Sequence, residues 1–123
     1  MNDSDKGLEL WEHLAGVINS QPLIEKNNKA IWGLLHKWSN HEWLAVLNVV
    51  ADLQDSHPEY FHAFQNKALA EAARVIVNEG STHPRVLDTR EHKNKMWRMA
   101  MCLREIWNKM QQDLARPRLF EHA

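Results

Sequence analysis

The sequence has few of the residues that build nucleotide loops and disulfide frameworks. Its 123 residues include four glycines and one cysteine. Scattered glycines form neither a Walker loop nor a dinucleotide fingerprint, so nucleotide hydrolysis is not expected. A lone Cys102 excludes an internal disulfide and suits a reducing compartment. The most apolar run, 43–51, falls short of the roughly 20 residues of a membrane span, and the acidic N-terminus lacks a signal-peptide pattern. We therefore expect a cytoplasmic protein without membrane association.

Histidine is plentiful, but its spacing does not predict a metal site. The chain has eight histidines. His41 and Glu42 begin like the zinc-protease motif H-E-x-x-H, yet Ala45 stands in place of the second histidine. Glu59 and His62 form a single Glu-x-x-His pair, whereas a di-iron bundle uses a pair of such motifs. We expect neither a metal nor a cofactor, and no catalytic residue is assigned.

Helix signals recur along the chain, and strand signals do not. Apolar residues repeat at three- and four-residue spacing, which predicts amphipathic helices at about 4–21, 25–38, 40–54, 57–79 and 89–115. Serine followed three residues later by glutamate, at positions 39 and 56, matches the capping box that opens a helix. Asp88 with Glu91 is expected to cap the last helix.

These elements predict an all-α fold without a sheet. We expect one domain, 1–123, folded as a compact bundle of about five helices with a long C-terminal helix, and residues 118–123 as a tail. The segment 40–54 is apolar over more than half of its circumference, so we expect it at the centre of the bundle.

Charge is divided unevenly between the two halves of the chain. Residues 1–62 contain four Lys/Arg and nine Asp/Glu, whereas residues 63–123 contain eleven and seven. An asymmetry of this kind steers the encounter with a charged partner, although it says nothing about the fold.

The last expected helix carries two apolar faces, although one is sufficient to join a core. The second face is formed by Arg90, Lys93, Trp97, Met101 and Arg104. Trp and Arg are favoured at the centres of protein interfaces, and Met adapts to irregular partners. Trp32 and His36 lie outside the inward stripe of the second helix, beside Lys29, and form another patch. The alternative is that both indoles are core residues of a small bundle.

This second face leads to the first functional hypothesis. We expect a small, non-catalytic regulator, inhibitor or accessory subunit that docks on a larger protein or nucleoprotein assembly through it. A homodimer is equally compatible with the pattern.

Direct binding of single-stranded RNA or DNA is the second hypothesis. The basic segment 83–104 supplies Arg85, Arg90, Lys93, Lys95 and Arg98 as phosphate contacts. Trp97 adds an indole face on which a base can stack. Residues 38–66 contain no Lys or Arg, so the third helix is not a major-groove recognition helix. Binding through phosphates predicts a steep dependence on salt, whereas a Trp-centred protein interface does not.

A ribonuclease is the third hypothesis. Arg85 and His92 are separated by six residues, which resembles the R-x(4-6)-H element of the HEPN ribonucleases, themselves small helical domains. The resemblance covers eight residues and implies ribonuclease activity. Val86 departs from the polar residue that usually follows the arginine of that family, and Arg116 with His122 repeats a similar spacing.

Overall fold

The computed structural model describes residues 3–79 and 89–115. Over these residues the chain forms five α-helices and one 3-10 helix, and no strand. The elements are α1 (Asp3–Asn19), α2 (Lys29–Lys37), α3 (Asn40–Ser56), η1 (Pro58–Tyr60), α4 (Ala63–Glu79) and α6 (Arg90–Ala115). The prediction of a compact helical bundle with a long C-terminal helix is confirmed. The expected cap at Asp88 and the tail 118–123 lie outside the described residues.

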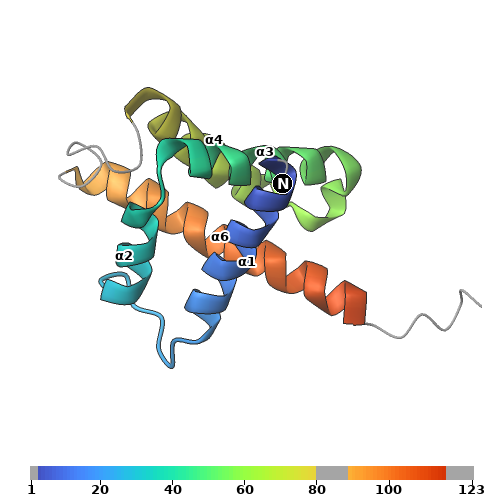
Figure 1. The fold of residues 1–123 in the computed structure, drawn as a ribbon, viewed down its shortest axis with the longest axis horizontal. Coiled ribbons are helices and arrows are strands. Elements are labelled where there is room, and N and C mark those ends of the chain that lie inside the picture. The colour runs from blue at the N-terminus through green and yellow to red at the C-terminus, as the bar shows by residue number, and fades with distance from the viewer. Residues whose placement is uncertain (1–2, 80–88, 116–123) are drawn as a thin grey trace, which may run out of the picture.

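The helix α6 runs the length of the molecule, and α1 crosses it (Figure 1). The helix α4 lies along α6, whereas α3 packs against α1 and α4. Several apolar side chains of α3, among them Leu44 and Leu47, are only partly buried. The expectation that this segment forms the centre is therefore wrong, because α3 covers one side of α1. The centre is the crossing of α1 and α6, where Trp11 and Leu103 are fully buried.

The six tryptophans of the chain form three pairs. Trp11 of α1 packs on Trp107 of α6 with ring centroids 5.3 Å apart, and its indole N–H donates to the Leu103 carbonyl at 2.8 Å. The other pairs are Trp38 with Trp43, at 4.6 Å, and Trp32 with Trp97, at 5.7 Å. The Trp11–Trp107 and Trp32–Trp97 pairs join helices that are far apart in the sequence, and the Trp38–Trp43 pair joins the end of α2 to α3, so the indoles act as ties between helices.

Helix capping explains the observed start of α2 and confirms one capping box. The side chain of Ser39 accepts from the backbone N–H of Glu42, and the Glu42 carboxylate accepts from the N–H of Ser39, as the sequence predicts. The helix α2 begins at Lys29, four residues later than expected, because the Asn28 side chain accepts from the first free N–H groups of the helix.

The helix α4 also begins later than expected, at Ala63. Residues Pro58–Tyr60 first form the 3-10 turn η1. Gln65 and His62 then satisfy each other's backbone: the His62 N–H donates to Gln65 Oε1 at 3.2 Å, and the Gln65 N–H donates to His62 Nδ1 at 3.4 Å. This reciprocal pair takes the place of the capping box predicted at Ser56 and Glu59.

No helix in the described part of the chain combines the length and the apolarity needed to cross a bilayer.

The contact between α1 and α3 depends on the absence of a side chain at Gly7. A Cβ atom there would clash with the Ala45 carbonyl oxygen and lie 2.7 Å from Val49 Cγ2. We expect Gly7→Ala to lower the free energy of unfolding by about 1–3 kcal/mol, as overpacking does. Urea denaturation measures this change.

The matched control is Gly16→Ala on the same helix. A Cβ atom at Gly16 meets nothing within 4 Å, so this substitution should stabilise the protein by about 0.5–1 kcal/mol through helix propensity. Equal effects of the two substitutions would contradict the close approach of α1 and α3.

Candidate functional site

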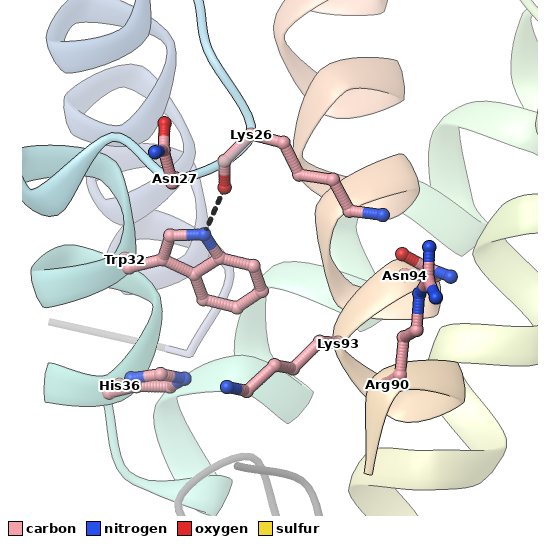
Figure 2. Close-up of a pocket in the computed structure, with 7 residues that line it drawn as sticks. All are labelled: Lys26, Asn27, Trp32, His36, Arg90, Lys93 and Asn94. Atoms are coloured by element: carbon pink, nitrogen blue, oxygen red, sulfur yellow. Dashed lines mark hydrogen bonds between the residues drawn. The ribbon is translucent and has the colours of Figure 1, made fainter. Parts of the chain in front are cut away.

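A pocket of about 590 Å³ opens between α2, the α1–α2 connection and the first turns of α6 (Figure 2). Its lining residues are Lys26, Asn27, Trp32, His36, Arg90, Lys93 and Asn94. Three of these side chains are cationic, and within the described part of the chain no acidic residue lines the pocket. The structure thus brings together four residues that the sequence assigned to two separate patches, Trp32 and His36 from α2 and Arg90 and Lys93 from α6.

Trp32 is fixed on two sides. Its ring stacks on Trp97 of α6 with an interplanar angle of 28°, and its indole N–H donates to the Lys26 carbonyl. In Figure 2 the six-membered ring points across the opening toward Arg90 and Asn94. Trp32 is half-buried, so part of the indole remains available as an aromatic wall of the pocket.

His36 lies one turn after Trp32, with its ring centroid 5.2 Å from that indole. Burial, and then the charge of the neighbouring Lys93, lower the pKa of His36 below its ordinary value of about 6.5. The Lys93 ammonium points toward the imidazole (Figure 2). His36 is therefore a neutral hydrogen-bonding group at neutral pH.

The pocket wall also contains two buried polar atoms without a hydrogen-bond partner among the described residues. They are Nε2 of His36 and Oδ1 of Asn94. Buried polar atoms in proteins are nearly always hydrogen-bonded, so these two atoms mark positions that a bound molecule can satisfy.

The cations of α6 are divided between two sides of the helix. Arg90 and Lys93 line the pocket, whereas Lys95 pairs with Glu91 at 3.2 Å and Arg98 with Glu71 of α4 at 3.8 Å. Arg85 lies outside the described residues. Of the four basic residues of the nucleic-acid hypothesis that the structure describes, Arg90 and Lys93 therefore remain at the pocket, and Lys95 and Arg98 pair elsewhere.

The predicted docking face of α6 is partly covered by other helices. Trp97 and Met101 are half-buried and pack against the core, and Trp32 occupies one face of Trp97. Arg104 is also half-buried, and its Nε atom has no hydrogen-bond partner in the described part of the chain. Trp32 and Trp97 are each half-buried, so neither the docking face nor the alternative of two core indoles is decided. Docking through this face stays a prediction, and in the structure Trp97 packs behind Trp32.

His92, singled out for the ribonuclease hypothesis, lies on the opposite side of α6. It lines a small pocket with residues of α4, among them Glu71 and Arg74, away from Trp32. Its intended partner Arg85 is outside the described residues, so that hypothesis stays a prediction.

Sequence reasoning missed three residues of the pocket: Lys26, Asn27 and Asn94. The signal available was the polar run from residue 25 to residue 28, which we expected to be helical. Asn28 ends that run as the cap of α2, so Lys26 precedes the helix and its backbone carbonyl can accept from Trp32.

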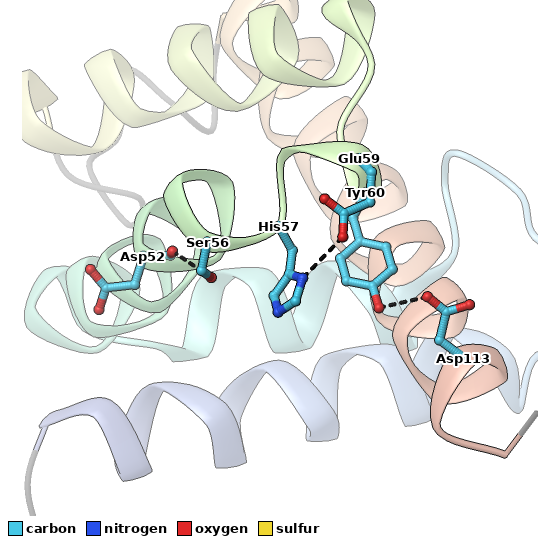
Figure 3. Close-up of polar contacts among 6 residues, drawn as sticks. All are labelled: Asp52, Ser56, His57, Glu59, Tyr60 and Asp113. Carbon is cyan, nitrogen blue, oxygen red and sulfur yellow. Dashed lines mark hydrogen bonds and ion pairs between the residues drawn. The ribbon is translucent and has the colours of Figure 1, made fainter. Parts of the chain in front are cut away.

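A second polar cluster ties η1 to the end of α6 (Figure 3). The Tyr60 hydroxyl donates to the Asp113 carboxylate at 2.6 Å, and His57 contacts Glu59 at 3.0 Å. The Ser56 hydroxyl donates back to the Asp52 carbonyl at 3.0 Å. The capping box expected from Ser56 and Glu59 is therefore wrong, because both side chains bond elsewhere. Most of this cluster is exposed, and its contacts are those of a structural tie.

Within the ranges that the structure describes, no three His, Cys, Asp or Glu side chains lie close enough to hold a metal ion. Comparison of the chain with protein-family models, curated proteins and solved structures finds no match. Any function of the pocket is therefore argued from the chemistry of the residues that line it.

Cys102 is a poor nucleophile in the folded protein. It is 6% exposed, and burial together with Glu105 raises the pKa of its thiol to about 11. We expect a thiol-reactive dye to label the folded protein at least about a hundredfold more slowly than the urea-unfolded protein, because the thiolate is scarce and covered. Labelling at equal rates would contradict this burial.

The lowered pKa of His36 predicts a pH dependence of stability. In the window between the folded and unfolded pKa values of His36, the unfolded chain binds more protons, so stability is full above about pH 6.5 and falls as pH falls through the folded value. Urea midpoints at about pH 7.5 and about pH 5.5 measure the loss.

Because other histidines also titrate, the decisive comparison is with His36→Gln. This variant should lose less stability on acidification than the unsubstituted protein. An identical loss in both proteins would show that the pKa of His36 is not lowered.

Proposed function

We propose that the protein is a non-catalytic binding module that docks on a nucleoprotein assembly and contacts single-stranded nucleic acid through the pocket of Trp32 and Arg90. One observation carries this proposal. Lys26, Arg90 and Lys93 surround the exposed part of the Trp32–Trp97 stack, and none of the described lining residues carries a carboxylate. Cations beside an aromatic surface are the combination that binds phosphates and unstacked bases.

The charge pattern on α6 favours an anionic partner. Lys95 and Arg98 have acidic neighbours within the protein, but Arg90 and Lys93 have no ion pair with a described residue. Arg90 and Lys93 are three positions apart on one helix, where like charges repel. Bound phosphates relieve this repulsion.

The contacts of α6 also support a protein partner, although less directly. Met101 and Arg104 lie between the Trp32–Trp97 stack at α2 and the Asn19–Asn108 amide pair at α1. The unpartnered Nε of Arg104 is a donor that a protein surface can satisfy. Docking through Trp97, Met101 and Arg104 is therefore the second candidate.

Fluorescence anisotropy with labelled single strands of about eight nucleotides tests the proposal. We expect log K to fall with log salt with a slope of about −2, since three cations replace about 0.7 counterion each on a single strand. Arg90→Gln with Lys93→Gln should weaken binding about tenfold and reduce the slope by about 1 to 1.5.

The charge-matched control is Lys95→Gln with Arg98→Gln, which removes two cations from the same helix outside the pocket. This control should leave the affinity for the strand within about twofold of the unsubstituted protein, because salt screens the effect of charges that do not contact the strand. Equal weakening by both double variants, or the absence of any binding, would refute the pocket as a nucleic-acid site. Binding of a protein partner that is insensitive to salt and lost in Arg104→Ala would favour the second candidate.

A further inference from the structure

We propose that this pocket takes a terminal phosphate monoester, the phosphorylated end of a single strand, in preference to a phosphodiester within it. The inference rests on the proposed function and specifies the chemistry of its ligand. It follows from the charge and the size of the pocket and from its buried polar atoms without a partner among the described residues.

Charge is the first argument. Lys26, Arg90 and Lys93 bring three positive charges to one cavity, and no acid is among its described lining residues. A phosphodiester carries one negative charge, whereas a phosphate monoester carries about −1.5 to −2 at neutral pH. The monoester therefore neutralises the pocket more completely.

Size is the second argument. Side chains from α2, the α1–α2 connection and α6 line the opening, with Trp32 on one side and Arg90 and Asn94 on the other (Figure 2). A volume of about 590 Å³ lies within the range of small-ligand pockets and accommodates one nucleotide.

The unpartnered polar atoms supply the third argument. His36 Nε2 and Asn94 Oδ1 are buried in the wall that the cations surround, and neither has a hydrogen-bond partner among the described residues. The Asn94 oxygen is an acceptor, so a ribose hydroxyl or a base N–H can satisfy it, and Trp32 offers apolar surface to the base. Inorganic phosphate uses only the cations, so it should bind more weakly than a nucleotide end.

The test compares one oligonucleotide in three forms: with a 5′-phosphate, with a 3′-phosphate, and with hydroxyl groups at both ends. We expect one of the phosphorylated forms to bind about tenfold more tightly than the hydroxyl form, as one charge-assisted contact provides. This preference should disappear in Arg90→Gln with Lys93→Gln and persist in Lys95→Gln with Arg98→Gln. Circular dichroism confirms that each variant is folded.

Phosphorus NMR provides a direct readout. The terminal monoester resonance should shift on binding, and the shift should be absent with the Arg90 and Lys93 double variant. Inorganic phosphate and a phosphoserine peptide of equal charge serve as competitors; displacement of the strand by that peptide at equal concentration would overturn the inference in favour of a phosphoprotein.

The outcomes separate this inference from the proposed function. Equal, salt-dependent binding of the three forms, lost on substitution of Arg90 and Lys93, would overturn the end preference and leave nucleic-acid binding intact. Absence of binding by all three forms would refute both.

Discussion

The hydrogen bond from the Trp11 indole to the Leu103 carbonyl fixes the crossing on which the rest of the structure depends. The two residues are far apart in the sequence, and both are fully buried. The thirteen residues from the crossing back to Arg90 span about 20 Å at the rise of an α-helix, so the first turns of α6 project well beyond α1. There α2 packs, through the stack of Trp32 on Trp97. The pocket therefore exists because α6 is held at its middle and is long enough to reach a second helix.

The position of the pocket is set by tertiary contacts more than by local helix stability. The helix α2 has nine residues, too few for a stable helix in isolation. It is held by buried Ile31 and Leu35 and by the bond from the Trp43 indole to the Leu35 carbonyl at 3.2 Å. Trp32 contributes to this attachment and also lines the pocket. The attachment of α2 and the wall of the pocket consequently share one side chain, and a substitution of Trp32 affects both.

Much of the fold follows from the sequence because helix periodicity and capping are local. The capping box of Ser39 was predictable from four consecutive residues, whereas the same spacing at Ser56 failed because Ser56 bonds back to Asp52. The pocket, in contrast, depends on contacts between residues that are distant in the sequence.

Trp32 and Trp97 were each predicted to lie off the inward stripe of their helix, as were Arg90 and Lys93. No sequence pattern, however, indicates that the two indoles stack on each other. Lys26 was not predicted to line the pocket, because its position there depends on α2 beginning at Lys29.

The two sides of α6 differ in how their positive charges are paired. On the α4 side of this helix, Arg98 lies beside Glu71, so charge is compensated within the protein. On the α2 side, Arg90 and Lys93 repel each other, and Lys93 together with burial keeps His36 neutral. The chain carries enough acidic residues to compensate both sides, since Asp and Glu number 16 against 15 Lys and Arg. The absence of an ion pair for Arg90 and Lys93 among the described residues is therefore a matter of placement and not of composition, and it leaves positive charge around a half-buried indole.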